Sequence, residues 1–151
     1  MALSNKTAFF LPALNYSLRQ KHVCQKNFLY AYDSINSLYC VFNLKGEKIY
    51  SSDKYCIICN PFVFATRNKD GYVLYDNSGN VIYENKDGFS LVKGFIEHPN
   101  YYCVSNNGKK GVVDLYGKVI VPFRFDDVDY LDSFFLVKQS SSYFGTKLQG
   151  L

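Results

Sequence analysis

The sequence predicts an all-β protein in which about ten short strands form stacked antiparallel hairpin repeats. Three observations support this fold class. Aromatic residues make up 18% of the chain and are all Phe or Tyr, side chains that favour a pleated sheet. One turn motif occurs three times, at intervals of 33 and 38 residues, and a period of 33–38 residues is typical of repeat architectures. An apolar, aromatic segment precedes each copy and gives every repeat a further strand.

Each copy of the turn motif predicts a hairpin. The copies are VFNLKGEKIY (41–50), LYDNSGNVIY (74–83) and VVDLYGKVIV (112–121). They share two apolar residues, then Asn or Asp, two variable residues, Gly, two variable residues and Ile. The Asn or Asp side chain can bond to backbone amides two residues on, and the Gly supplies the positive φ that closes a turn.

The whole chain, 1–151, is predicted to be a single domain with internal repeats. Further strands are expected at NFLYAY (27–32), FVFATR (62–67), YYCVSN (101–106) and SFFLVK (133–138). The division is an N-terminal basic segment with a partial repeat at 1–27, repeats at about 28–61, 62–100 and 101–132, and a partial repeat at 133–151. A helix is expected, if anywhere, around 12–26. Because one hairpin cannot bury its own face, the units must stack, either as an open array or as a closed barrel or ring.

The segment KKGVVDLYGKVIVPFRFDDV, 109–128, resembles the WG-repeat (KWG-repeat) family of bacterial proteins. Its unit runs Lys-Trp-Gly, two apolar residues, Asp, two residues, Gly-Lys, two apolar residues and Pro, then Tyr-Asp-Asp. This chain has no Trp, and the Trp position falls on Tyr39, Tyr72, Lys110 and, in the last unit, Phe144. The resemblance covers 28–148 and implies stacked β-hairpins without a shared enzymatic activity.

The positive charge of the chain is concentrated near its start. The net charge is +4, and Lys6, Arg19, Lys21 and Lys26 precede the first acid, Asp33. Cations interleaved with aromatic rings are the ingredients of single-stranded RNA binding, although a solvated edge would look the same. The candidate nucleic-acid or partner-binding residues are Tyr16, Arg19, Lys21, His22, Lys26, Tyr30 and Tyr32.

The cysteines raise the question of a metal or redox site. Cys56 and Cys59 form a C-x-x-C pair within CIIC, but the two Ile favour a strand, in which positions i and i+3 point to opposite faces. Cys24 and Cys40 precede Cys56 at steps of 16 residues, so convergence of these four thiols on a metal stays open. Five cysteines is an odd number, which indicates a reducing compartment. No metal or other cofactor is expected.

Other candidate sites have simpler structural explanations. His98, beside Glu97, could serve as a base but lies in a predicted loop. Asp126, Asp127 and Asp129 could bind a divalent cation, although turn chemistry is the simpler explanation. The sequence has no phosphate-binding Gly motif and no G-x-S-x-G element, so we expect no enzyme.

These observations favour a non-catalytic protein-interaction module or small inhibitor from a bacterium or phage. Its partner could be a nucleic-acid-handling effector such as a defence nuclease. The alternative is an RNA or single-stranded nucleic-acid binder that uses the N-terminal segment, and a carbohydrate-binding repeat would require export. No apolar run approaches the ~20 residues of a membrane span, so we expect a cytoplasmic protein without a membrane partner. The oligomeric state stays open.

Overall fold

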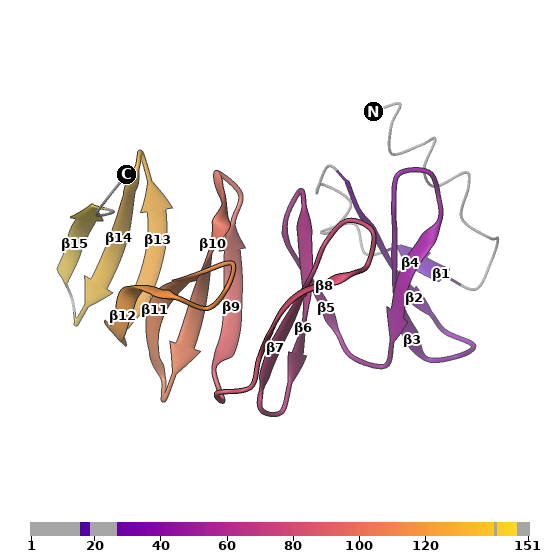
Figure 1. Ribbon diagram of the computed structural model, residues 1–151, viewed down its shortest axis with the longest axis horizontal. Coiled ribbons are helices and arrows are strands. Elements are labelled where there is room, and N and C mark those ends of the chain that lie inside the picture. The colour runs from indigo at the N-terminus through magenta and orange to yellow at the C-terminus, as the bar shows by residue number, and fades with distance from the viewer. Residues whose placement is uncertain (1–15, 19–26, 141, 148–151) are drawn as a thin grey trace.

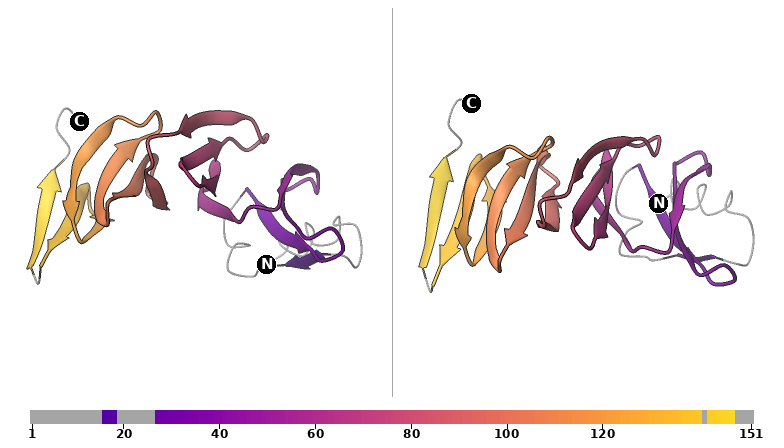
Figure 2. Two further views of the ribbon diagram at one scale, coloured as in Figure 1. Left: turned by 90° about the horizontal axis from the view of Figure 1, so that it is seen from below. Right: turned by 60° about the horizontal axis from the view of Figure 1, so that its bottom comes forward.

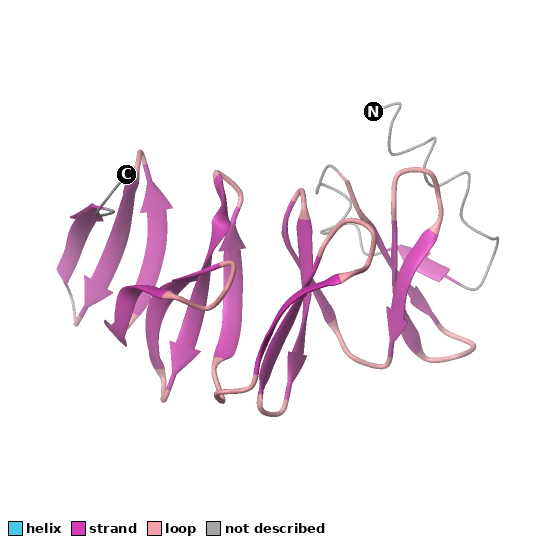
Figure 3. Cartoon of the chain, in the orientation of Figure 1, coloured by secondary structure: helices cyan, strands magenta, loops and turns pink. Residues whose placement is uncertain are grey.

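The fold is all-β, as the sequence predicts. The structure is a computed structural model, and it describes residues 16–18, 27–140 and 142–147. These residues form 15 strands in four antiparallel sheets and contain no helix (Figures 1 and 3). Consequently, the described residues include no helix that could cross a membrane.

Each sheet is a meander in which every strand pairs with the next one in the chain. Sheet 1 contains β1 (Tyr16–Leu18), β2 (Leu29–Asp33), β3 (Leu38–Phe42) and β4 (Lys48–Ser52). Sheet 2 contains β5 (Cys56–Asn60), β6 (Val63–Asn68), β7 (Gly71–Tyr75) and β8 (Val81–Asn85). Sheet 3 contains β9 (Ser90–Phe95), β10 (His98–Asn106), β11 (Lys109–Asp114) and β12 (Val119–Phe125). Sheet 4 contains β13 (Asp127–Leu131), β14 (Phe134–Gln139) and β15 (Ser142–Lys147).

The four sheets follow one another along a bent row, with sheet 1 and sheet 4 at opposite ends (Figure 2). The described residues therefore form an open array rather than a closed ring. The three predicted hairpins are present as β3–β4, β7–β8 and β11–β12, and the expected upstream strands are β2, β6, β10 and β14. There are more strands than expected because the strands that begin the four sheets, β1, β5, β9 and β13, and the last strand, β15, lie outside these motifs.

The sequence repeats and the sheets are offset by one strand. The repeat predicted at 62–100 begins with β6, the second strand of sheet 2, and includes β9, the first strand of sheet 3. Each sequence repeat therefore spans two sheets and joins them covalently.

The helix expected around 12–26 is not seen where this segment is described. Tyr16–Leu18 forms β1, which pairs antiparallel with β2 so that Tyr16 lies opposite Asp33. The other residues of that segment lie outside the described part of the chain.

A hydrophobic core fills each space between neighbouring sheets. Sheets 1 and 2 enclose Phe28, Tyr30, Val41, Cys56, Ile58 and Phe64. Sheets 2 and 3 enclose Cys59, Val63, Ala65, Tyr72, Leu74, Leu91, Tyr102, Val104 and Val113. Sheets 3 and 4 enclose Phe95, Cys103, Val112, Val121, Phe125, Val128, Phe135 and Val137. Strand alternation lets inner sheets supply both neighbouring cores, so stacking accounts for the high apolar content.

Polar side chains also tie neighbouring sheets together. The Asn27 amide donates to the Pro61 carbonyl at 2.7 Å, between sheets 1 and 2. The Arg67 guanidinium donates from β6 to the Leu91 carbonyl on β9 at 2.8 Å. Such bonds satisfy polar groups at the sheet junctions and restrict sliding of one sheet over the next.

Candidate interaction surface

The three motif turns have the same hydrogen bonds. The Oδ1 atom of Asn43, Asp76 or Asp114 accepts bonds from two backbone amides. The donors are Lys45 and Glu47 in the first turn, Ser78 and Asn80 in the second, and Tyr116 and Lys118 in the third, at 2.8–3.0 Å. Each turn Gly donates to the carbonyl of its Asn or Asp at 3.1 Å. The predicted role of the Asn or Asp is therefore confirmed.

The Gly of each turn is required for conformation, and at two turns also for space. Gly46, Gly79 and Gly117 have φ values of 81°, 84° and 85°, a region that L side chains avoid. A Cβ on Gly79 would overlap the carbonyl oxygen of Ile49, which lies on β4 of the preceding sheet. A Cβ on Gly117 would overlap the Tyr83 hydroxyl, which extends from β8 of the preceding sheet. Each of these turns thus lies directly against the last strand of the sheet before it.

The second and third turns therefore each lie at the junction with the preceding sheet, and the first two turns line a common cleft. We call the segments 43–46, 76–79 and 114–117 the turn row. Within it the Asn or Asp and the Gly are constant, whereas the residue before the Gly differs in all three turns. The two residues at the tip of each turn are Leu44-Lys45, Asn77-Ser78 and Leu115-Tyr116. Tyr116 is 70% exposed, the highest value among the large hydrophobic side chains of the described residues.

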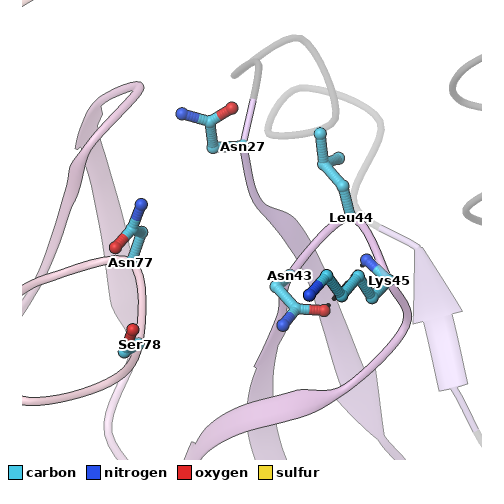
Figure 4. Close-up of a pocket in the computed structure, with 6 residues that line it drawn as sticks. All are labelled: Asn27, Asn43, Leu44, Lys45, Asn77 and Ser78. Carbon is cyan, nitrogen blue, oxygen red and sulfur yellow. Dashed lines mark hydrogen bonds between the residues drawn. The ribbon is translucent and has the colours of Figure 1, made fainter.

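A cleft of about 240 Å³ separates the first two turns (Figure 4). Its lining consists of Asn27, Asn43, Leu44, Lys45, Asn77 and Ser78. The Asn43 amide donates to the Glu47 carboxylate at 2.6 Å, and the Asn27 amide is bonded to Pro61, so both lining groups are held in place. The amide, hydroxyl and ammonium groups of this lining can form hydrogen bonds with the backbone or polar side chains of another polypeptide.

The predicted N-terminal site is only partly described. Arg19, Lys21, His22 and Lys26 lie outside the described residues, and Tyr16 is known only as a β1 position.

The two described rings of that site, Tyr30 and Tyr32, differ in exposure. Tyr32 is half-buried, with its ring centroid 5.0 Å from that of Tyr39. Tyr30 is fully buried between sheets 1 and 2. This corrects the expectation that Tyr30 contacts a partner. The physical reason is that both faces of β2 are covered, since Leu29 and Ala31 on its other face are also buried.

The two thiols of the CIIC motif lie in different cores. Cys56 belongs to the core between sheets 1 and 2, and Cys59 to the core between sheets 2 and 3. The prediction that they point to opposite faces is therefore confirmed, and they cannot bind one metal ion together. Cys24 lies outside the described residues. Within the described part, no three His, Cys, Asp or Glu side chains gather to hold a metal.

Burial makes these thiols weak acids. It raises the pKa of Cys56 and of Cys59 to about 12, and that of Cys103 to about 11. Because the thiolate is the nucleophile, we expect iodoacetamide at pH 8 to leave Cys56, Cys59 and Cys103 of the native protein unmodified. The same cysteines should react in urea. Peptide mass spectrometry would measure this, and rapid labelling of native Cys56 would contradict the packing.

The same shifts predict lower stability in alkali. The unfolded thiols have the ordinary pKa of 9.0, whereas folded Cys56 and Cys59 reach about 12. Between these values the unfolded state binds fewer protons, so the stability present below pH 9 is lost as pH rises towards 12. Each thiol contributes up to about 1.4 kcal/mol per pH unit.

Urea unfolding at pH 7 and pH 10 would measure this loss. The Cys56→Ala, Cys59→Ala variant should show a smaller fall in unfolding free energy. Buried Tyr72 and Tyr102, whose pKa values burial also raises, contribute in the same direction and remain in both proteins. An equal fall in both proteins would contradict the assignment to the thiols.

The acidic segment 126–129 binds lysines from sheet 3. Lys109 pairs with Asp126 at 2.5 Å, Lys110 with Asp127 at 3.0 Å, and Lys93 with Asp129 at 3.2 Å. The hydrogen bonds from Lys109 and Lys110 are the main cause of the lowered pKa of Asp126 and Asp127. Ammonium groups occupy the carboxylates considered for a cation, and these pairs connect sheets 3 and 4.

Lys110 therefore has a structural role at the position where the resembling family has Trp. The hairpin register places Tyr72 opposite Arg67 and Lys110 opposite Ser105. Both belong to the second residue pair from their turn. In sheet 4 that pair is Lys138 and Tyr143, and Phe144 lies one position further on. The sequence alone does not distinguish the two, because Tyr143 and Phe144 are adjacent aromatic residues.

His98 lies in β10 rather than in a loop. Its ring centroid is 4.3 Å from that of Tyr101 and 5.5 Å from that of Tyr130. These contacts give the ring a packing role beside the core between sheets 3 and 4.

No protein-family model matches the chain, and no curated protein matches it. Among solved structures, the chain is similar to the crystal structure of BamB from Moraxella catarrhalis, with a TM-score of 0.46 and 16% sequence identity. The match covers 78% of this chain and 39% of the BamB chain. The resemblance to WG repeats stays a prediction.

Proposed function

We propose that this chain is a non-catalytic protein-interaction module that binds a partner through the turn row. The single observation that carries the proposal is the contrast between a constant turn framework and the exposed residue before each turn Gly, which is Lys45, Ser78 or Tyr116. Rigid scaffolds that present variable loops are a common basis of recognition, because the loops can change without disturbing the core.

The chemistry of the turn row supports a protein partner. Tyr116 offers a large, rigid ring with a polar tip, a residue type enriched where binding energy concentrates. Val81 and Val119 begin the strands after the second and third turns and are also exposed. Lys45 and the cleft beside it add polar groups at the other end. Apolar and aromatic side chains at one end and polar groups at the other are both found in protein–protein interfaces.

Capture from the native host would test this function. We expect the tagged protein to retain its partner after RNase treatment, and the Tyr116→Ala variant to lose at least about tenfold in affinity, as expected for an aromatic hot spot. Ile35→Ala is the matched control, because Ile35 is equally exposed but lies in the β2–β3 loop. Unchanged capture by Tyr116→Ala, or loss with both variants, would exclude the turn row as the binding surface.

We also propose a cytoplasmic location and a bacterial or phage origin, with an inhibited effector such as a defence nuclease as one class of partner. The free thiols of Cys40, Cys56, Cys59 and Cys103 support a reducing compartment.

The second candidate is RNA or single-stranded nucleic-acid binding through Arg19, Lys21 and Lys26. The charge excess of the N-terminal segment favours it, and it requires affinity that falls steeply with salt. Charge reversal at these positions should abolish it and leave capture of a protein partner by the turn row unchanged.

A further inference from the structure

At two of the three junctions between sheets, an asparagine amide bridges the space beside the first turns. Between sheets 1 and 2, Asn27 donates to the Pro61 carbonyl at 2.7 Å. Between sheets 2 and 3, the fully buried Asn60 donates to the Pro99 carbonyl and to the Tyr102 hydroxyl, each at 3.3 Å. At both junctions one sheet thus supplies the donors for acceptors on the next sheet.

The junction between sheets 3 and 4 contains a cavity at the corresponding position. Its volume is about 350 Å³, and it lies between the β9–β10 turn and the β13–β14 turn. Both turns are at the same end of their sheets (Figure 1). The lining consists of Glu97 from the first turn and of Tyr130, Leu131, Asp132 and Ser133 from the second hairpin. The cavity is therefore bounded by described residues of two neighbouring sheets.

The polar groups without a partner at this junction can all accept hydrogen bonds. Within the described part of the chain, neither Glu97 nor Asp132 has an ion pair or a side-chain hydrogen bond. His98 follows Glu97, and its ring centroid lies 5.5 Å from that of Tyr130. Its Nδ1 atom is buried and has no hydrogen-bond partner among the described residues. Carboxylates accept only and an imidazole nitrogen can accept, so the junction lacks donors and positive charge.

The β13–β14 turn presents its polar side chains from a constrained backbone. Asp132 and Ser133 have φ values of 46° and 75°, which glycine and asparagine adopt more readily than other residues. The chain nevertheless has a carboxylate and a hydroxyl at these two positions. A two-residue turn leaves the backbone little freedom, so both side chains start from fixed points at the cavity.

A guanidinium group matches this arrangement of acceptors. It is planar, carries five N–H donors and pairs with a carboxylate through two parallel bonds. Its flat face also stacks on aromatic rings, and Tyr130 supplies such a ring in the lining. A metal ion is a poorer match, because no three His, Cys, Asp or Glu side chains gather to hold one in the described part.

We propose that the cavity between the β9–β10 and β13–β14 turns binds a guanidinium group. Glu97 and Asp132 accept its N–H groups, the Ser133 hydroxyl can accept another, and the Tyr130 ring packs against its face. The group can come from a small guanidine or from an arginine side chain of another protein. This proposal is independent of the proposed function, because the cavity and the turn row have no residue in common.

Nuclear magnetic resonance titration of the isotope-labelled full chain would test the site. The probes are ethylguanidinium chloride and the capped tripeptide Gly-Arg-Gly, at constant ionic strength. We expect the amide signals of Glu97 and Ser133 to shift and saturate. Both carboxylates are exposed to solvent, so the dissociation constant should be modest, at roughly 1–10 mM.

Isosteric variants would assign the binding to the two carboxylates. The Glu97→Gln, Asp132→Asn double variant keeps the shape of the cavity and should bind at least about tenfold more weakly. Asp70→Asn is the matched control, because Asp70 is also exposed and without an ion pair but lies in the β6–β7 turn. It should bind as the wild type does. Unchanged signals away from the cavity would confirm that each variant folds.

The outcomes separate the proposal from its alternatives. No saturable shift with either probe up to about 50 mM would overturn it, since binding in the expected range would be nearly complete there. Equal shifts with the uncharged citrulline tripeptide, an equal loss for Asp70→Asn, or tighter binding of calcium chloride would also overturn it. Binding of the arginine tripeptide would support a protein side chain as the source, and binding of ethylguanidinium alone would support a small guanidine.

Discussion

Replacing Gly79 with alanine is expected to lower the free energy of unfolding by about 3–5 kcal/mol. Two effects add at this position. The residue has a φ of 84°, which an alanine adopts only under strain, and its Cβ would overlap the backbone oxygen of Ile49 in the neighbouring sheet. Because a backbone carbonyl cannot turn aside, the two sheets would have to move apart. Urea denaturation monitored by circular dichroism would measure the change.

Other glycines provide matched controls for the conformational part of this effect. Gly88 and Gly108 have φ values of 77° and 79°, but a Cβ there would contact nothing within 4 Å. Alanine at either position should cost only about 1 kcal/mol. Gly117→Ala should fall between, since the Tyr83 ring that it would meet can shift. Equal losses at all four glycines would show that backbone strain alone determines the cost and that sheet packing does not.

Truncation of Tyr72 to alanine is expected to cost about 3–5 kcal/mol. The ring is fully buried between sheets 2 and 3, with its centroid 6.1 Å from that of Tyr83. Its removal leaves a cavity that both sheets would line, and rigid β-meanders collapse poorly into such a space. Tyr116→Ala, at an exposed turn tip, should change stability by no more than about 0.5 kcal/mol. A loss below about 1 kcal/mol for Tyr72→Ala would contradict the packing of this core.

The conservative change at the same residue should have the opposite sign. The Tyr72 hydroxyl is buried and has no hydrogen-bond partner among the described residues. Tyr72→Phe removes this polar group and keeps the ring, so we expect the unfolding free energy to rise by about 1 kcal/mol. Thermal and urea denaturation beside Tyr72→Ala would separate the contribution of the ring from that of the hydroxyl. A loss of stability would indicate a bound water or other partner at the oxygen.

Local interactions explain which elements could be predicted from the sequence. The β3–β4, β7–β8 and β11–β12 hairpins depend on an Asn or Asp side chain and a Gly three residues later, and both are visible in the chain. Grouping of the strands was harder. A strand such as β5 pairs with β6, but its repeat pattern associates it with the preceding unit, and only backbone pairing resolves this offset.

The candidate site was less accessible to sequence reasoning because it depends on stacking. The turn row forms because Gly79 and Gly117 pack against the preceding sheets. No sequence motif indicates such a contact. Tyr30 is predicted at the surface because the residues that cover it are distant in the chain. They belong to sheet 2 and include Cys56 and Phe64. The ion pair of Lys110 was equally inaccessible to sequence reasoning, because its partner Asp127 lies on another sheet.

The offset between sequence repeat and sheet bears on how such a gene could change length. Deletion of one repeat, residues 62–100, would join β5 to the strand segment beginning at 101. The first strand of sheet 2 would then stand where β9 stood, and the remaining three strands of sheet 3 would complete a four-stranded sheet. Unequal recombination at repeat boundaries would therefore add or remove whole sheets without leaving an unpaired strand. The unit that is inherited and the unit that folds need not coincide for the array to grow.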